Sequence, residues 1–358
     1  MENTRIIAIK PEKSVTKVGV FQNSNLLFLK NVNHTQEELN KFSKVSDQDE
    51  YRADKILQEL KNAEIRLDLV RAIVGRGGLI KPIFSGVYGV NDAMIRDLRN
   101  SAIADHHINL GGLIAHQLSK KIENSEAFIA DPVIVDEMAE IATYSGLPNL
   151  HRKSIFHALS HKSVARKFAK SQVKEYEEMN LIVCHLGDGT SIGAHHNGKV
   201  IDVNQAFDGE GPFSFERAGS LPLRGMIKMC FSGSYTEREI LNMIQMKGGM
   251  VAYFGTNSPA KIESLVSEGN KEVKAVYEAM AYQVSKYIGS MAPVLKGKVD
   301  AILLTGHMSQ SKRFVNLIRE RVELIAPIHI FPDEDTVKSL ATNALLVMKG
   351  EIEAKVYE

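Results

Sequence analysis

The stretch LIVCHLGDGTSIGAHHNGKVIDV, residues 181–203, decides the fold class of this chain. An apolar run at 181–184 ends in a small polar turn, and two later runs meet at an Asn-Gly pair. Apolar runs joined by such short turns predict three consecutive antiparallel strands. Glycines in the first turn let backbone N–H groups approach an anion, and the hydroxyls of Thr190 and Ser191 add donors. The turn is therefore predicted to grip a phosphate, although it lacks the GxxxxGK[ST] pattern of a P-loop.

Residues 6–30 repeat the same order of strand, short polar turn, strand, Asn-containing turn and strand. Their first turn also contains hydroxyl residues, Ser14 and Thr16. One interpretation is an internal duplication, in which two related turns on two domains face each other across a cleft and hold the phosphates of a nucleotide. The other is that any two three-stranded meanders share this pattern.

Short apolar runs alternate with helical patterns through almost the whole chain, which predicts an α/β fold of mixed sheets flanked by helices. The predicted strands are 6–9, 17–21, 26–29, 72–74, 127–130, 181–184, 191–195, 199–203, 301–304 and 328–331. The predicted helices are 51–60, 109–122, 163–173, 271–291, 310–325 and 336–348. Turn-forming residues cluster at 145–149, which predicts two domains that divide near residue 150.

The overall composition narrows the class of protein. The 358 residues are enough for two domains with a core each. The 44 basic and 43 acidic side chains nearly cancel, so neither nucleic acid nor a membrane surface is expected as a partner. No apolar run approaches the roughly 20 residues of a membrane span, and the run near the N-terminus is too short for a signal peptide. Cys184 and Cys230 form neither a disulfide framework nor a metal-site spacing, which predicts a cytoplasmic protein.

Six ordered blocks of the sequence resemble segments of the butyrate kinases, in the acetokinase family and the wider superfamily of acetate and sugar kinases, heat-shock proteins and actin. They are VGRGGLIKPI at 74–83, AFIADPVIVDEM at 127–138, RKSIFHALSHKSVAR at 152–166, HLGDGTSIGAHHNGKVIDVN at 185–204, FDGEGPFSFERAGSLP at 207–222 and LLTGHMSQSKRFV at 303–315. The resemblance implies a two-domain ribonuclease-H-like (actin-like ATPase) fold with a nucleotide cleft between the domains. Residues 1–150 with the C-terminal helix 336–358 would form one domain, and 151–335 the nucleotide-binding one.

The resemblance also implies the chemistry, which is reversible, ATP-dependent phosphorylation of the carboxylate of butyrate or a similar short-chain acid, with Mg²⁺. It further implies a homo-oligomer, a dimer or higher. Two alternatives stay open. One is a catalytically weak or inactive paralogue of the kinase fold that acts as a binding or assembly protein. The other is a related kinase for another acceptor such as a branched short-chain acid; no sugar-binding block is recognisable.

Three residues are expected at the chemistry. Arg217 lies in a polar, glycine-rich loop, and a planar cation suits the equatorial oxygens of a phosphoryl group in transfer. By resemblance Arg217 is the transition-state arginine, His157 points at the transferring phosphoryl group, and Asp131 organises the metal or the transition state. The alternatives are a solvated arginine at 217 and an ordinary turn residue at 131.

Other residues are expected to bind the substrates. Arg76 ends a predicted strand between glycines, where it would clamp the substrate carboxylate or serve the loop structurally. The nucleotide and its phosphates are assigned to Ser14, Thr16, Lys17, His185, Gly187, Asp188, Gly189 and Gly306. Glu334, in an acidic cluster, is a second metal candidate beside Asp131. His161 is expected to be structural, and the remaining candidates His106, His107, His195 and His196 are expected to be solvated.

Several positions depart from the family pattern, and they concentrate where phosphates are expected. The first turn reads Lys-Pro-Glu-Lys-Ser-Val-Thr-Lys at 10–17 where the family has Asn-Pro-Gly-Ser-Thr-Ser-Thr-Lys. Glu12 would place a negative charge there, which Lys10 and Lys13 could offset. Asp188 replaces a glycine or asparagine of the second turn, and His307 replaces a glycine of the adenosine motif. These departures are the reason that the inactive paralogue is kept as an alternative.

Overall fold

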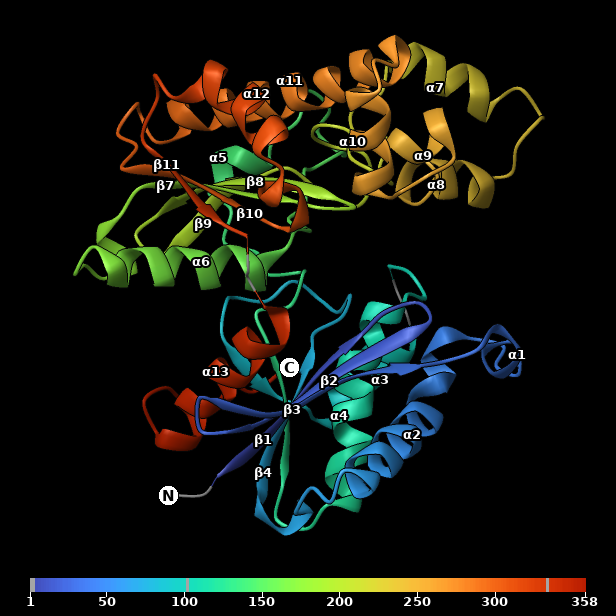
Figure 1. Ribbon diagram of the computed structural model, residues 1–358, viewed down its shortest axis with the longest axis vertical. Coiled ribbons are helices and arrows are strands. Elements are labelled where there is room, and N and C mark those ends of the chain that lie inside the picture. Colours follow the sequence, from blue (N-terminus) through green and yellow to red (C-terminus); the bar gives the residue numbers. More distant parts are fainter. Residues whose placement is uncertain (1–3, 101–102, 333–334) are drawn as a thin grey trace. The chain divides into compact units, whose positions relative to one another are not determined.

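The computed structural model describes residues 4–100, 103–332 and 335–358 (Figure 1). The chain divides into two compact units, Met1–Val135 with Asp335–Glu358, and Asp136–Glu334. The domain limits predicted from the sequence are 1–150 with 336–358 and 151–335. They are not tested by this division and remain a prediction. Each unit is described by itself below.

The first unit is built on a six-stranded sheet of order β3-β2-β1-β4-β6-β5. Its strands are β1 (Arg5–Pro11), β2 (Val15–Gln22), β3 (Asn25–Asn33), β4 (Val70–Arg76), β5 (Val87–Gly89) and β6 (Glu126–Ala130). The meander β1-β2-β3 is antiparallel, whereas β1, β4 and β6 run parallel, so their carboxyl ends share one edge. The helices are α1 (Gln36–Leu39), α2 (Asp49–Asn62), α3 (Asp92–Asn100), α4 (Leu110–Lys121) and α13 (Thr336–Lys349). Figure 1 shows α2 and α4 on one face of this sheet and α13 on the other.

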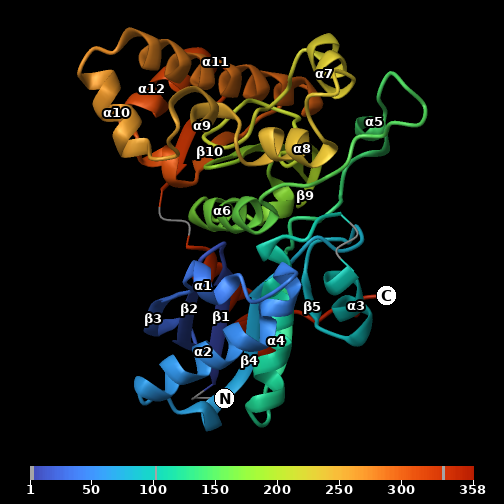
Figure 2. The same ribbon diagram turned by 90° about the vertical axis from the view of Figure 1, so that its right-hand side faces the viewer.

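The second unit has a five-stranded sheet of order β11-β10-β7-β8-β9. The strands are β7 (Leu181–Leu186), β8 (Thr190–His196), β9 (Lys199–Val203), β10 (Ala301–Thr305) and β11 (Ile328–Phe331). The helices are α5 (Glu140–Thr143), α6 (Ala158–Ser171), α7 (Leu223–Cys230), α8 (Glu237–Gln245), α9 (Gly249–Phe254), α10 (Pro259–Ser267), α11 (Lys271–Val294) and α12 (Lys312–Val322). Figure 2 shows α6 on one face of the sheet and α11 with α12 on the other. Residues of alternating strand positions therefore fill two separate cores.

Short 3₁₀ helices complete the described chain at Val45–Gln48, Leu67–Leu69, His107–Asn109, Tyr176–Glu178 and His307–Gln310. All of the strands and helices predicted from the apolar runs are present, and the α/β class with mixed sheets flanked by helices is confirmed. The helix expected at 163–173 begins earlier, at Ala158. The predicted repeat has a structural counterpart, because each meander is joined at its first strand by two further parallel strands. The sequence did not predict the three-residue strand β5, the helices α1, α3 and α5, or the helices between 223 and 267.

Candidate active site

The turn between β7 and β8 is the centre of the site in the second unit. Leu186 and Thr190 close the antiparallel ladder, so Gly187, Asp188 and Gly189 form the turn. The carbonyl oxygen of Asp188 accepts hydrogen bonds from the backbone N–H of Glu216, at 3.1 Å, and from the hydroxyl of Ser214. The loop that carries Arg217 is therefore fastened directly to the predicted phosphate turn.

Two nitrogens of the Arg217 guanidinium are buried at this turn without an acceptor. Its Nε and Nη1 atoms are buried and have no hydrogen-bond partner among the described residues. Its Cζ atom lies 4.9 Å from the ring centroid of Phe207, a cation–π contact that holds the side chain in place. Burial lowers the pKa of Arg217 below its ordinary value, although the carboxylates of Glu216, Asp188 and Asp208 oppose that shift. A buried cation that lacks an acceptor is suited to an anionic ligand.

His157 and His185 lie beside the same turn. Their rings stack with centroids 3.9 Å apart and an interplanar angle of 15°. His157 precedes α6 and its Nδ1 lies 2.9 Å from Oγ of Ser191 on β8. A Cβ atom added at Gly189 would lie 3.6 Å from His157 and 3.4 Å from Arg217, so the glycine brings the backbone close to both side chains.

Gly306 closes the site from the end of β10. Thr305 is paired with His185 across the parallel strands β10 and β7, which places Gly306 next to Leu186. Its φ is +85°, and a Cβ there would lie 2.5 Å from the carbonyl oxygen of Leu186. Only glycine meets both conditions. His307, the next residue, has its Nε2 4.0 Å from Oδ1 of Asp188.

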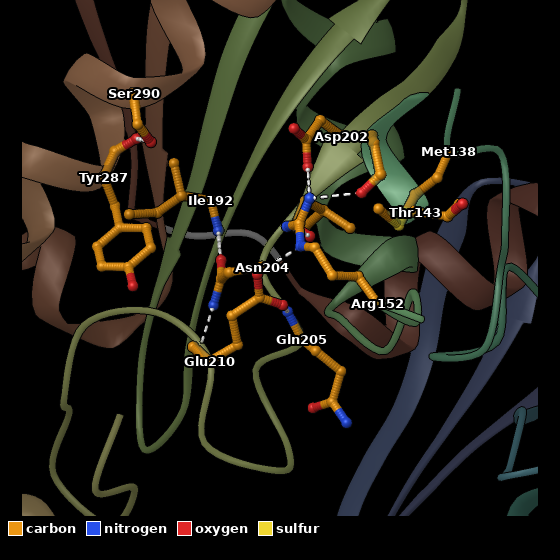
Figure 3. Close-up of polar contacts among 12 residues, drawn as sticks. Met138, Thr143, Arg152, Ile192, Asp202, Asn204, Gln205, Glu210, Tyr287 and Ser290 are labelled. Atoms are coloured by element: carbon orange, nitrogen blue, oxygen red, sulfur yellow. Dashed lines mark hydrogen bonds and ion pairs between the residues drawn. The ribbon is translucent and has the colours of Figure 1, made fainter. Parts of the chain in front are cut away.

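Two polar side chains brace the loop that leads to Arg217 (Figure 3). Arg152 donates to Asp202 at 2.9 Å and to Glu210 at 2.7 Å, and also to backbone carbonyls of β9 and α5. The carboxylates of Glu210 and Asp202 hold the pKa of Arg152 above its ordinary value although burial acts against them. Asn204 accepts from the N–H of Ile192 at 2.7 Å and donates to the carbonyls of Thr190 and Glu210 at 3.1 Å.

In the first unit a buried arginine, Arg52, donates hydrogen bonds to the β1–β2 turn. Arg52 donates to the carbonyl oxygens of Glu12 and Lys13, at 2.9 and 3.0 Å, and to Oγ1 of Thr16 at 3.1 Å. Thr16 is fully buried and also contacts Nε2 of His34 at 2.9 Å. The Thr16 hydroxyl is thus engaged by the protein, and a direct contact of Thr16 with phosphate stays a prediction.

The other side chains of this turn are more open. Ser14 is exposed, and Lys17 lies 3.6 Å from Asp335. Lys10 pairs with Glu12 at 2.8 Å, which offsets the anionic departure from the family pattern within the turn itself.

Arg76 and Asp131 occupy the same edge of the first sheet. Arg76 ends β4 and is paired with Ala130 of β6, directly before Asp131. Asp131 has a φ of +38°, which is unusual for a residue with a side chain. Its Oδ1 accepts from the Ser85 hydroxyl at 2.6 Å and from the N–H of Gly86 at 2.9 Å. These two donors fix the carboxylate at the strand end, where ligands of α/β proteins bind.

The sequence-based assignments therefore fall into two groups. The second unit brings together Arg217, His157, His185, Gly187, Asp188, Gly189 and Gly306. The first unit places Ser14, Thr16, Lys17, Arg76 and Asp131 along the edge formed by β1, β4 and β6. Glu334 lies outside the described residues. Within the described ranges no group of three or more His, Cys, Asp or Glu side chains could hold a metal ion.

Sequence reasoning missed some supporting residues and misplaced one. Arg52 lies outside every resembling block. Asn204 and Arg152 each fall in such a block, but the partners that define their roles lie elsewhere in the sequence. The expectation that His195 is solvated was wrong, because its ring is completely buried between Tyr176 and His161. Alternating positions on β8 could have indicated this, since Ser191, Gly193 and His195 face the same side of the sheet. No described helix combines the length and apolar character needed to span a bilayer.

Comparison with known proteins adds the family. The family model described as the acetokinase family matches residues 147–326. Butyrate kinase 2 of Clostridium acetobutylicum is 47% identical over 354 residues, which cover 99% of each chain. A probable butyrate kinase of Clostridium botulinum is 46% identical over 353 residues, with the same coverage of both chains.

Solved structures show the same fold. The acetate kinase of Porphyromonas gingivalis matches with a TM-score of 0.79 and 16% identity, over 96% of this chain and 100% of the other. A propionate kinase of Francisella tularensis matches with a TM-score of 0.74 and 18% identity, over 95% of this chain and 98% of the other.

Proposed function

The chain belongs to the acetokinase family, and from that premise we propose that it transfers the γ-phosphoryl group of ATP to the carboxylate of butyrate or a similar short-chain acid. In the forward direction a carboxylate oxygen attacks the γ-phosphorus and the bond to the β-phosphate oxygen breaks, which yields an acyl phosphate and ADP. The observation that carries the proposal is the Arg217 guanidinium, whose buried Nε and Nη1 have no acceptor in the described chain. Phosphoryl transfer needs such a cation at the equatorial oxygens.

In the second unit, the turn of Gly187, Asp188 and Gly189 offers backbone N–H groups to phosphate oxygens. Gly306 allows the chain to pass close to the nucleotide with a positive φ. Arg217 stabilises the charge that develops on the moving phosphoryl group, and His157 donates a hydrogen bond to it. Stacking on His185 and the contact with Ser191 hold the His157 ring in position.

In the first unit, we assign Arg76 to the carboxylate of the acid, because a planar guanidinium binds a carboxylate through two parallel hydrogen bonds. Ser14 and Lys17 are the phosphate-binding candidates of the β1–β2 turn, and Thr16 supports that turn from beneath. Asp131 is the carboxylate that would hold Mg²⁺. Its fixed position fits this role, since Mg²⁺ in kinases is bound by one or two carboxylates together with substrate phosphates. When bound, the ion would neutralise charge on the phosphates.

The two alternatives are not favoured. Relatives named as butyrate kinases match nearly the whole chain at 46–47% identity, which does not favour a paralogue that has lost its activity or a kinase for a branched acid. The departures at Glu12 and Asp188 each have a basic side chain beside them, the ammonium of Lys10 in one case and the imidazole of His307 in the other.

Trapping of the acyl phosphate as a hydroxamate tests the proposal. Wild-type protein with Mg²⁺, ATP and butyrate is expected to form butyryl hydroxamate in the presence of hydroxylamine. Arg217→Met is expected to abolish the product, whereas Arg224→Met, which removes an exposed arginine of α7, is a matched control and should keep full activity. Folded wild-type protein that forms no hydroxamate from butyrate or other short-chain acids would contradict the proposal.

Two further properties, the oligomeric state and the location in the cell, are also proposed. The family resemblance favours a homo-oligomer, which sedimentation equilibrium would measure. A cytoplasmic location agrees with the two cysteines, Cys184 and Cys230, both being free thiols.

A further inference from the structure

A row of buried polar side chains extends from His157 into the interior of the second unit. His157 Nδ1 and His161 Nε2 each lie 2.9 Å from Oγ of Ser191. His161 Nδ1 lies 3.2 Å from Nε2 of His195, and His195 Nδ1 lies 2.6 Å from the Tyr176 hydroxyl. The links run from the start of α6 through β8 to the 3₁₀ helix Tyr176–Glu178. Every nitrogen of the two inner imidazoles thus has a partner within the row.

The two inner imidazoles are neutral. His161, His195 and Ser191 have no exposed surface. Burial lowers the pKa of His161 to about 3 and that of His195 well below its ordinary value, and the nearby ammonium of Lys162 adds to both shifts. A neutral imidazole has one N–H donor and one bare acceptor nitrogen.

Because both inner imidazoles are neutral, the direction of one hydrogen bond in the row fixes the direction of all the others. If His161 donates toward Ser191, its other nitrogen must accept from His195, which must in turn accept from Tyr176. The row therefore has only two complete hydrogen-bonding arrangements. In one, the protons of His157, His161 and His195 all lie on Nε2; in the other, all three lie on Nδ1.

The tyrosine end distinguishes the two arrangements. A phenol is a better hydrogen-bond donor than acceptor, whereas a bare imidazole nitrogen is a good acceptor. The ammonium of Lys162 lies 5.4 Å from the ring centroid of Tyr176, and a nearby cation strengthens the phenol as a donor. Tyr176 therefore donates to Nδ1 of His195, and every later link follows in the same direction.

We propose that Tyr176, His195, His161 and Ser191 act as positioning residues that fix His157 as the Nε2–H tautomer. Ser191 then donates its hydroxyl proton to Nδ1 of His157, and the proton on Nε2 is available to the transferring phosphoryl group. The catalytic consequence rests on the proposed function, in which His157 donates to that group. The proton arrangement itself depends only on the buried row.

Long-range ¹H–¹⁵N NMR of protein labelled with ¹⁵N-histidine tests the arrangement without substrate, because protonated and bare ring nitrogens have well-separated ¹⁵N shifts. His→Gln variants at 157, 161 and 195 assign the signals. In the wild type all three residues are expected to be Nε2–H tautomers. If His157 carries its proton on Nδ1, the proposal is overturned even when the protein is an active kinase.

Variants at the far end test the coupling. Tyr176→Phe removes the terminal donor but keeps the ring, so His157 and His161 are expected to become mixtures of both tautomers. With the productive form reduced to about half, kcat should fall about twofold while the KM values stay unchanged. His195→Gln keeps an N–H donor facing His161 and should preserve the Nε2–H form at His157.

The matched control is Tyr277→Phe. Tyr277 is also fully buried in the second unit, and its hydroxyl contacts Glu263 and Ser311, outside the row. It is expected to leave the signals of His157 unchanged. Unaltered tautomers in Tyr176→Phe would overturn the proposal, whereas the expected tautomers in a protein without kinase activity would contradict the proposed function alone.

Discussion

The Nε2 atom of His307 lies 4.0 Å from Oδ1 of Asp188, where the end of β10 faces the β7–β8 turn. Both residues depart from the family pattern, and each alone would disturb a nucleotide site, one by its charge and the other by its size. Together they place an imidazole ring beside the carboxylate, at a distance where the ring can interact with the new charge. The two substitutions are therefore better understood as one coupled change than as two losses.

A double-mutant cycle tests this coupling. His307→Gly leaves the Asp188 carboxylate alone at the phosphate turn, so the KM for ATP is expected to rise about two- to fivefold, the effect of a partly exposed pair. Asp188→Asn should cancel most of that rise. Additive effects of the two substitutions would show that the two residues act independently.

Removal of the Arg217 side chain should lower activity without lowering stability. Its buried Nε and Nη1 lack acceptors, so Arg217→Met removes two unsatisfied donors and is expected to raise the free energy of unfolding by about 1 kcal/mol. Arg152→Met is the control. Arg152 has two carboxylate partners, and its loss should lower that free energy by about 3 kcal/mol. Denaturant titration measures both; a strong destabilisation by Arg217→Met would show that this side chain is structurally paired.

Acid should destabilise the fold through buried neutral histidines. Burial lowers the pKa of His34 to about 4 and of His161 to about 3 from an ordinary 6.5, and that of His195 well below it. At pH values between the lowered pKa of the folded protein and the ordinary 6.5, the unfolded chain binds protons on these histidines that the folded chain does not. The free energy of unfolding is therefore complete above pH 6.5 and falls by about 1.4 kcal/mol per pH unit for each such residue as the pH drops toward about 4.

Urea titrations over this pH range give the slope. His34→Gln should reduce the slope of unfolding free energy against pH by the contribution of one histidine. His196→Gln, at an exposed position, should leave the slope unchanged. A slope that stays the same in His34→Gln would mean that His34 is charged in the folded protein.

Gly306→Ala should impair both folding and nucleotide binding. The new methyl group would meet the carbonyl oxygen of Leu186 at 2.5 Å, at a residue whose φ is +85°. A loss of about 2–3 kcal/mol of unfolding free energy and a higher KM for ATP are expected. Gly297→Ala is the control, since its φ is +73° but nothing lies within 4 Å. It should lose only about 1 kcal/mol, the backbone part of the effect. Equal losses in the two variants would exclude a role for the close approach.

Arg52 is expected to matter for the β1–β2 turn although it lies outside it. Arg52→Met leaves the carbonyl oxygens of Glu12 and Lys13 without their buried donor, which should lower the free energy of unfolding by about 2–3 kcal/mol. The KM for ATP should rise, because the turn loses its support. Lys61→Met removes an exposed cation of the same helix and is the control for stability and KM. An unchanged KM in Arg52→Met would separate this turn from nucleotide binding.

The sequence predicted the strands and helices whose apolar pattern is regular. The meander at β7, β8 and β9 and its counterpart at β1, β2 and β3 were expected because period-two alternation and Asn-containing turns act locally. The helices between 223 and 267 were not expected. In α7 the apolar residues do recur at helical spacing, but the helix has only eight residues and none of them is buried, so this short pattern is weak evidence for a helix.

The candidate site follows the same division. Arg217, His157 and the turn at Gly187 and Gly189 could be assigned from motifs, since each motif is a continuous run of sequence. The support given by Arg52 and Asn204 could not, because a buried polar residue is defined by partners that come from other parts of the chain. At His195 the alternation along β8 did carry a local signal of burial, but its partners Tyr176 and His161 come from other segments.

By itself, then, the sequence determined the α/β class, the order of most strands and helices, the family resemblance and the residue types available for phosphoryl transfer. The three-dimensional arrangement was needed to show that two nitrogens of Arg217 are buried without an acceptor, that Asp188 faces His307, and that His161 and His195 extend a polar row behind His157. The physical reason is the distance along the chain over which each effect acts. Periodicity and turn chemistry act between near neighbours in sequence, whereas desolvation, hydrogen-bond direction and charge compensation depend on groups that only folding brings together.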